Sequence, residues 1–302
     1  MSDEVGRWTD ATMAVLARHS HDPGAVRSPE DLARAVQKTI TAAILEQRAT
    51  LWSGLLGKQV LYPHPSGVAF WIRLGDGISM YAIRADRDDS ATRFILSHLT
   101  PGGTFLDVGA NTGWFALRAG ARYRELGGGL VHAFEPQPVM FDLITRSIAE
   151  NQLQDLVNLH GVALGNEEKT VWMATPPFNS GGSTVRFKQI NESVPVQLTR
   201  FDDLNLPLGR VDIMKVDIEG SEPMFIEGAA EFIREHRPKI YSELHPTKLQ
   251  RVSNRTREDY LRQMEELGYR ALVLGRDGQT APLEPAHLDD PRKLLDVVFD
   301  PA

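Results

Sequence analysis

The segment with the clearest chemical potential runs from Asp107 through Gly109 and Asn111 to Gly113, in a D-x-G-x-N-x-G pattern. It joins an apolar run typical of a strand to the start of a helix-like run. Glycine permits positive φ and close approach of the backbone, so main-chain N–H groups at a helix start can contact a ligand. A dinucleotide site would read G-x-G-x-x-G, and Asn111 stands where its second glycine belongs. The pattern therefore argues against a pyrophosphate ligand, and Asp107 favours a ligand with a cationic amino group.

A second acid, Glu135, ends the next strand-like run and precedes Pro136. A carboxylate at that position can accept hydrogen bonds from both hydroxyls of a ribose. An acid near a helix start is also favourable to the helix dipole, but we favour the ribose. The third run leads to Ala163, whose backbone we expect beside an adenine, although Gly165-Asn166 would equally form a hairpin turn.

Charged residues also crowd the end of the fourth run, at Lys215, Asp217 and Glu219. A carboxylate at the tip of a buried strand is costly without a partner, and the two-residue period of a strand predicts Lys215 as the partner of Asp217. The fifth run adds Glu243 and His245 at the same sheet edge. The candidate catalytic residues are Asp217, His245 and Glu243, with His245 or Asp217 as the base. A magnesium ion held by Asp217, Glu219 and Glu243 is a less favoured alternative, because the spacing shows no metal motif.

Alternating strands and helices position these residues. Strand-like runs occupy 104–108, 130–134, 157–164, 211–216 and 239–244, and two more follow at 269–274 and 294–299. Helix-like runs lie at 91–99 and 139–150 and begin near 114, 222 and 257. This alternation predicts an α/β fold with a parallel sheet that is covered by helices on both faces. The irregular stretch at 176–184 is long enough to contact the substrate.

The first part of the chain has a different pattern. Residues 1–57 are predicted to form a helical extension, with a helix that starts at Ser28-Pro29 and ends before Gly54. The extension would serve in packing or dimerisation, or as a lid over the substrate. Residues 58–85 switch to short strands joined by turns, at 60–62, 68–72 and 80–83. We therefore expect a main domain over 58–302 with a β-rich lead-in.

Four blocks of sequence together resemble the FkbM family of methyltransferases, at 105–113, 133–136, 215–222 and 237–243. The first block also resembles motif I of the class I S-adenosylmethionine-dependent methyltransferases. The resemblance covers residues from about 90 to 270, and the joint occurrence of the four blocks is more specific than any one of them. It implies a Rossmann-like, mostly parallel seven-stranded sheet that ends in an antiparallel pair, and S-adenosylmethionine as the methyl donor.

The resemblance also implies roles for the candidate residues. Asp107 and the turn from Gly109 to Gly113 would hold the methionine end of the donor, and Glu135 its ribose. The residues left to face the acceptor are Asp217, Glu219, Glu243 and His245. The usual acceptor in the family is a hydroxyl on a secondary metabolite or a glycan, so we expect an O-methyltransferase. The alternatives are N-methylation of an amino sugar or peptide-like metabolite, and a non-catalytic protein that keeps the fold as a binding scaffold; Asn111 disfavours a nicotinamide-dependent dehydrogenase.

Composition limits the partners of the chain. A net charge of −7 without a long basic run argues against nucleic acid, and the chain has no apolar stretch of about 18 residues to span a membrane. The absence of cysteine excludes disulfides, thiolate metal sites and a cysteine nucleophile. No signal-peptide pattern is visible at the start, so we expect a cytoplasmic protein with a small-molecule acceptor. The helical extension offers a surface on which a homodimer can form.

Overall fold

The computed structural model describes residues 55–79, 89–175, 179–186, 189, 193–290 and 292–302. The chain divides into two units, 1–58 and 59–302, and every element described below belongs to the second unit. The predicted helical extension lies almost entirely outside the described residues, and so does the predicted strand at 80–83.

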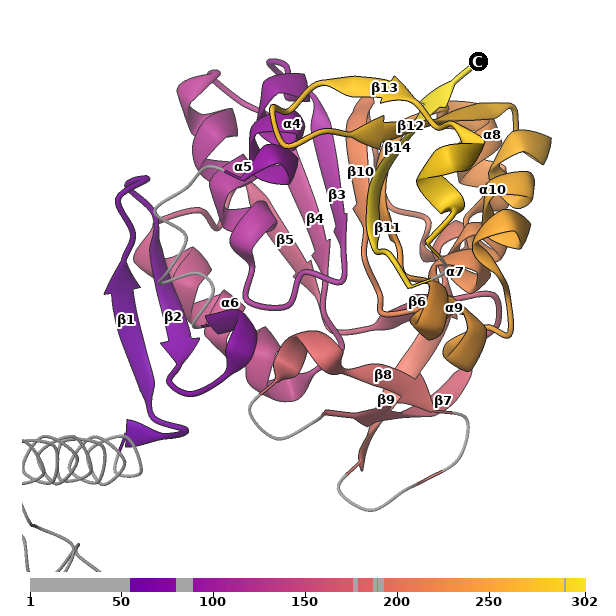
Figure 1. Cartoon of the computed structure of the whole chain (residues 1–302). Helices are drawn as coiled ribbons and strands as arrows, with labels where there is room; N and C mark the ends of the chain where they lie inside the picture. Colours follow the sequence, from indigo (N-terminus) through magenta and orange to yellow (C-terminus); the bar gives the residue numbers. More distant parts are fainter. Residues whose placement is uncertain (1–54, 80–88, 176–178, 187–188, 190–192, 291) are drawn as a thin grey trace, which may run out of the picture. The chain divides into compact units, whose positions relative to one another are not determined.

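An eight-stranded sheet forms the centre of this unit (Figure 1). Its strands follow the order β13 (Thr280–Pro282), β12 (Tyr269–Leu274), β14 (Leu295–Pro301), β11 (Lys239–Leu244), β10 (Val211–Val216), β3 (Thr104–Val108), β4 (Leu130–Phe134) and β5 (Val157–His160). The last five strands in this order are parallel, and the first three are antiparallel to their neighbours. The predicted Rossmann-like α/β fold is confirmed, and the short edge strand β13 adds one strand to the seven expected.

Helices cover both faces of the sheet. Successive residues of a strand point to opposite faces, so each face carries apolar side chains that pack against helices. In β3, Phe105 packs in one apolar cluster and Leu106 in the other. The first cluster includes residues of α4 (Ser90–His98), α5 (Trp114–Glu125) and α6 (Pro138–Glu150). The second includes residues of α7 (Glu222–Gly228), α8 (Ala230–His236), α9 (Pro246–Val252) and α10 (Arg257–Glu266). Figure 1 shows the helices of these two groups on opposite sides of the strands.

The predicted lead-in contains an antiparallel hairpin of β1 (Gln59–Pro63) and β2 (Ala69–Arg73). One side chain in α6 and one just after it bind the backbone at the free edge of β2. Asn151 accepts a hydrogen bond from the N–H of Ala69 at 2.8 Å, and Ser147 accepts one from the N–H of Trp71 at 2.8 Å. These contacts satisfy strand-edge groups and attach the hairpin to the main domain.

A second sheet of four strands between β5 and β10 was not predicted. Its order is β6 (Ala163–Gly165), β9 (Ser193–Arg200), β7 (Lys169–Ala174) and β8 (Thr184–Arg186). The single strand expected over 157–164 is therefore wrong. The chain leaves the main sheet after His160, because the segment from Ala163 pairs with β9 instead. Figure 1 shows this sheet below the carboxyl ends of the parallel strands.

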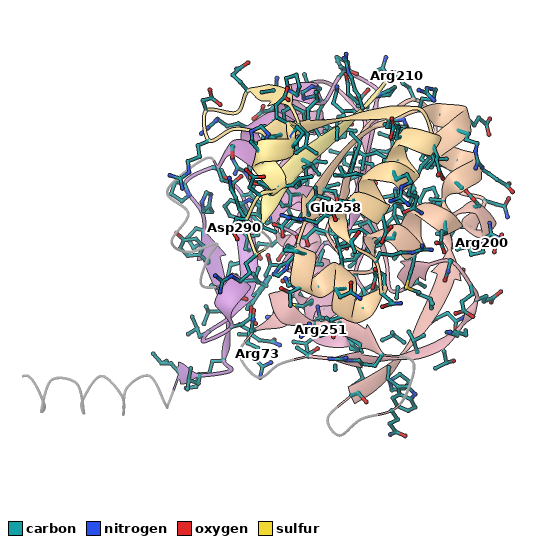
Figure 2. The ribbon with its side chains drawn as sticks, turned by 45° about the vertical axis from the view of Figure 1, so that its right-hand side comes forward. Arg73, Arg200, Arg210, Arg251, Glu258 and Asp290 are labelled. Carbon is teal, nitrogen blue, oxygen red and sulfur yellow. The ribbon has the colours of Figure 1, made fainter. Side chains whose placement is uncertain are left out.

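Charged side chains occur in two very different environments. Arg210 and Arg251 are exposed and lie at the outside of the ribbon (Figure 2). Asp107, Glu135 and Lys215 are instead buried at or beside the carboxyl ends of the parallel strands. Burial of ionisable groups is costly, so their clustering at one sheet edge points to a functional site there. In the described part of the chain, no helix has the length and apolar character needed to cross a membrane.

Candidate functional site

The predicted turn after β3 is present, and close packing fixes its backbone. Gly109, Asn111 and Gly113 all have positive φ, at 84°, 51° and 77°. The N–H of Gly109 donates to the carbonyl of Phe134 at 3.1 Å. A Cβ atom on Gly109 would lie 2.1 Å from the carbonyl oxygen of Asp217. Glycine is therefore required at position 109 both by the φ angle and by the chain that follows β10.

Glu135 directly follows β4, and its carboxylate binds this turn. The residue is buried, with 2% of its surface exposed. Its Oε2 accepts a hydrogen bond from the N–H of Asn111 at 2.7 Å, and its Oε1 accepts one from the N–H of Gln137 at 2.8 Å. Burial raises the pKa of Glu135 to about 7, although the two backbone hydrogen bonds oppose the rise. A carboxylate has about four acceptor positions, so Glu135 retains the capacity to bind two ligand hydroxyls.

Asp107 is fully buried and pairs with Lys215, which corrects the partner predicted for this lysine. Lys215 Nζ lies 3.2 Å from Oδ1 of Asp107 and donates to the carbonyl of Gly109 at 2.6 Å. The two residues are direct neighbours in the parallel register of β3 and β10. The partner of Lys215 is therefore set by the neighbouring strand and not by the two-residue period within β10. Burial lowers the pKa of Lys215, but nearby carboxylates, first that of Asp107, raise it above its usual value. Burial raises the pKa of Asp107, and the charge of Lys215 opposes that rise, so the two groups form a buried pair at ion-pair distance.

A cavity of about 420 Å³ opens at the carboxyl ends of the strands. This volume falls within the range of small-molecule sites, roughly 300–1,000 Å³. Its wall includes the predicted donor-binding residues Gly109, Asn111, Glu135, Pro136 and Ala163. It also includes Asp217, Glu219 and Glu243. These acids come from or follow β10 and β11, which lie on the opposite side of β3 from β4. The structure thus brings most of the predicted residues to one cavity, whereas Asp107, Gly113 and His245 are not part of its wall.

The wall beyond β10 is acidic, and one of its members, Asp296 of β14, was not predicted. The hydroxyl of Tyr241 donates to Oδ1 of Asp296 at 2.6 Å. Glu243 lies opposite Asp296 in the antiparallel register of β11 and β14. Burial raises the pKa of Glu243 to about 8, and the negative charges of Asp217 and Asp296 add to the rise. This carboxyl therefore titrates near neutral pH, where a base for proton transfer is most effective.

His245 caps the first turn of α9 and does not line the cavity. Its Nδ1 accepts a hydrogen bond from the N–H of Lys248 at 3.5 Å, and burial lowers its pKa. The strand period had placed His245 on the same face as Glu243. The strand ends at Leu244, however, so that period does not extend to the histidine. The ammonium group of Lys248 pairs with Glu219 at the cavity wall.

The irregular stretch after β7 reaches the cavity through Ser180, Gly181 and Ser183, while residues 176–178 lie outside the described part of the chain. Asp76, which was not predicted, holds it in place. The Asp76 carboxylate accepts hydrogen bonds from the N–H of Ser180 at 2.6 Å and from its hydroxyl at 2.9 Å. The same hydroxyl lies 3.1 Å from Oδ1 of Asn111. Asp76 and Ser180 are both buried, so they form an internal link between this segment and the turn after β3.

The acidic residues of the cavity are not grouped as metal ligands. Within the described ranges, no three histidine or acidic side chains form a group that could hold a metal ion. Asp217, Glu219 and Glu243 lie within those ranges. The described residues therefore show no preassembled group of ligands for a magnesium ion at these three acids.

The chain is similar to solved structures and curated proteins that are named as methyltransferases. The FkbM methyltransferase from Methylobacillus flagellatus KT is 17% identical, with 67% of this chain and 44% of that chain covered and a TM-score of 0.43. A TehB-like S-adenosylmethionine-dependent methyltransferase from Corynebacterium glutamicum ATCC 13032 Kitasato is 11% identical, with 74% and 93% covered and a TM-score of 0.44.

Two curated fungal proteins align with part of the chain. Methyltransferase sdnD from Sordaria araneosa is 26% identical over 168 residues, which are 45% of this chain and 64% of that protein. Methyltransferase 1 from Beauveria bassiana strain ARSEF 2860 is 27% identical over 151 residues, which are 42% of this chain and 59% of that protein. The chain therefore spans less than two thirds of the length of either relative.

The family assignment rests on the segment that builds the cavity. The methyltransferase FkbM domain matches residues 107–271, which are more than half of the chain. This segment begins at Asp107 and contains the turn after β3, Glu135, Asp217 and Glu243. The chain belongs to the FkbM methyltransferase family.

Proposed function

We propose that this protein is an S-adenosylmethionine-dependent O-methyltransferase that acts on a hydroxyl of a secondary metabolite or a sugar. One observation carries the proposal: a single cavity joins the turn after β3 and Glu135 to a wall of carboxylates from β10, β11 and β14. Membership of the FkbM methyltransferase family supports the reaction class. Two distinct ends in one cavity are what a two-substrate transfer requires.

The end of the cavity at Glu135 fits the adenosine part of the donor. The free acceptor positions of the Glu135 carboxylate suit the two ribose hydroxyls. Phe134, Ala163 and Leu164 provide an apolar wall beside it, which suits a purine ring. The absence of a side chain at Gly109 lets a ligand approach the backbone closely.

The protein's main task is to align the acceptor. S-adenosylmethionine supplies an activated methyl group, because its sulfonium leaves as a neutral thioether. The walls of the cavity must hold the acceptor oxygen in line with that methyl carbon, and alignment of this kind can supply several kcal/mol of the barrier. The acidic wall and Tyr241 offer hydrogen-bond partners for the hydroxyls of such an acceptor.

Glu243 is the base that the geometry favours. The acceptor hydroxyl must lose its proton as its oxygen gains the methyl group. Glu243 lines the cavity, and its pKa of about 8 makes it a stronger base than an ordinary carboxylate. The proton passes to the Glu243 carboxylate and from there to solvent. In the protein without ligand, burial and then the negative charges of Asp217 and Asp296 raise the pKa of Glu243.

The acidic wall also favours a second candidate, N-methylation of an amino sugar or peptide-like metabolite. Carboxylates at the ends of β10 and β11 would attract a protonated amine, and Glu243 would remove its proton before transfer. A non-catalytic scaffold is disfavoured, because the turn after β3 and the Glu135 contacts to it are intact.

Calorimetric titration with S-adenosylmethionine and S-adenosylhomocysteine tests the donor site. We expect the wild type to bind both and Glu135→Ala to lose both, with Glu258→Ala, an exposed position on α10 (Figure 2), as the matched control. Transfer of a labelled methyl group to hydroxylated metabolites, sugars and their amino counterparts then identifies the acceptor class. A wild-type protein that binds neither donor nor product would contradict the proposal.

A further inference from the structure

The acid predicted to hold the donor's amino group already has a partner. Lys215 Nζ lies 3.2 Å from Oδ1 of Asp107 and donates to the carbonyl of Gly109 at 2.6 Å. These are the acidic and carbonyl oxygens that a ligand's ammonium group would otherwise use beside the turn. Asp107 is fully buried and Lys215 is 3% exposed, so the ammonium of this lysine fills the position inside the protein.

A ligand cannot easily displace this lysine. Separating a buried ion pair leaves an uncompensated charge in a medium of low polarity, which is strongly unfavourable. The strands that carry the pair, β3 and β10, are neighbours at the centre of the main sheet, so the lysine has little room to move. Asp107 therefore acts on the ligand site through Lys215 and does not itself contact a ligand.

Asp217 lies next to the same turn and faces the cavity. Val216 pairs with Val108 in the parallel register, so Asp217 follows β10 where Gly109 follows β3. The N–H of Asp217 donates to the carbonyl of Val108 at 3.2 Å, and its own carbonyl packs against Gly109. Asp217 is half-buried and forms part of the cavity wall. Neither of the two lysines near its carboxylate pairs with it in the described ranges: Lys215 pairs with Asp107, and Lys248 pairs with Glu219.

The surroundings of Asp217 favour a cation. Its negative charge raises the pKa of Glu219, Glu243 and Asp296, which shows that these acids share one region of negative potential. Lys215 and Lys248 face the same region, but each is already paired, with Asp107 and Glu219 respectively. A ligand that brings a positive charge to Asp217 would relieve the repulsion among these carboxylates.

We propose that Asp217 binds the cationic amino group of the donor's methionine moiety, and that Asp107 is a positioning residue that holds Lys215 against the turn. The inference rests on the proposed use of S-adenosylmethionine and identifies which acid of the cavity receives its amino end. It also separates the roles of the two acids: Asp217 contacts the donor, and Glu243 the acceptor.

Two ligands that differ in the amino-acid part test this assignment by calorimetry. S-adenosylhomocysteine carries the amino group, whereas 5′-methylthioadenosine has the same nucleoside and thioether without it. We expect Asp217→Asn to weaken S-adenosylhomocysteine about 10- to 100-fold, as for a lost charge-assisted hydrogen bond, and to leave 5′-methylthioadenosine unchanged. The double variant Asp107→Asn/Lys215→Met removes the internal pair without leaving a buried charge. Because the pair positions the turn and not the amino group, the double variant should weaken both ligands by a similar factor and so retain the wild-type preference for S-adenosylhomocysteine over 5′-methylthioadenosine within about threefold.

Asp217→Asn with wild-type affinity for S-adenosylhomocysteine would overturn the assignment, and so would an equal loss of both ligands. Asp217→Glu, which retains the charge, should recover part of the preference for S-adenosylhomocysteine. If the wild type binds neither ligand, the proposed function fails, and the assignment fails with it. If the wild type binds both but Asp217→Asn changes neither affinity, only the assignment fails.

Discussion

The two ends of the cavity are built in different ways. The end proposed for the donor consists of one turn, from Gly109 to Gly113, whose backbone is fixed by positive φ angles and by contacts to Glu135 and the chain after β10. The acceptor end consists of side chains from separate strands, among them Glu243 and Asp296. A change at the donor end therefore disturbs the backbone, whereas a change at the acceptor end alters chemistry on an unchanged frame.

The difference explains how one fold can serve different acceptors. Carboxylates on β11 and β14 can be exchanged without moving the strands that carry them, because the sheet is held by apolar residues behind them. The turn after β3 has no such freedom, since a side chain at Gly109 would collide with the backbone at Asp217. We therefore expect substitutions at the two ends to separate into those that affect folding and donor binding and those that affect turnover alone.

Gly109→Ala should have the largest effect and would show how little the donor end tolerates. The added Cβ meets a backbone oxygen at 2.1 Å, and the φ of 84° is strained for alanine. We expect a loss of about 3 kcal/mol or more in the free energy of unfolding and no measurable binding of S-adenosylhomocysteine. Urea denaturation and calorimetry measure the two effects.

Gly127→Ala is the matched control, because Gly127 has nearly the same φ, 83°, with nothing within 4 Å of an added Cβ. It should lower stability by only about 1 kcal/mol and retain binding. Equal stability losses in the two variants would show that φ alone, and not the contact with Asp217, makes glycine necessary at position 109.

Glu243→Gln should show the opposite pattern at the acceptor end. The amide cannot take a proton, so kcat should fall about 10²- to 10⁴-fold while the affinity for S-adenosylhomocysteine changes little. A base acts when it is deprotonated, and kcat/KM reports the free enzyme, so the wild-type kcat/KM should rise with pH through about 8 and the variant should lack this rise. Labelled methyl transfer at several pH values measures both. A variant with the wild-type kcat and pH profile would remove Glu243 from the proposed mechanism.

Asp76→Asn tests the link that joins the segment from Ser180 to the donor end. The carboxylate accepts two hydrogen bonds from Ser180, and weakening both should cost about 2 kcal/mol of stability and raise the Kd for S-adenosylmethionine several-fold. Ser79→Ala is the control, since it removes a neighbouring hydroxyl but keeps the contacts between Asp76 and Ser180. A lower Tm with an unchanged Kd would mean that the link serves stability alone.

His132 lies in β4 away from both ends and should have the smallest effect. Burial lowers its pKa to about 4, and the ring nitrogen of His160 lies 3.1 Å away. The pKa of His132 in the folded protein is below its unfolded value of about 6.5. The stability that neutral His132 contributes is therefore fully present above pH 6.5 and is lost as the pH falls toward 4. We expect His132→Gln to reduce the stability difference between pH 7 and pH 5 by about 1 kcal/mol. Urea denaturation at the two pH values measures it; an unchanged difference would exclude His132 as a source of acid sensitivity.

The turn after β3 and the position of Glu135 were predictable from sequence, because their signals are local. Gly109 and Gly113 indicate a turn, and Glu135 directly follows a strand. The main sheet was predictable for the same reason, since each strand and helix has its own periodicity. The second sheet was missed, although Val171 and Met173 alternate in β7, because proline and loop residues interrupt the pattern before β9 begins.

The acceptor end depends on contacts between residues far apart in the chain. The partner of Lys215 follows from the pairing of β3 with β10, and strand order is not encoded in a local pattern. Asp296 reaches the cavity because β14 inserts beside β11. Asp76 is bonded to Ser180 because the stretch after β7 returns to the turn after β3. Tertiary contacts of this kind decide which acids meet, while local sequence decides which residues end strands.

A crystal structure of the complex with S-adenosylhomocysteine tests the central claim most directly. We predict the ribose hydroxyls on the carboxylate of Glu135, the amino group at Asp217 and the sulfur facing the side of the cavity that carries Glu243. Product bound elsewhere on the protein, or bound in reverse with its adenine among the carboxylates, would contradict the account.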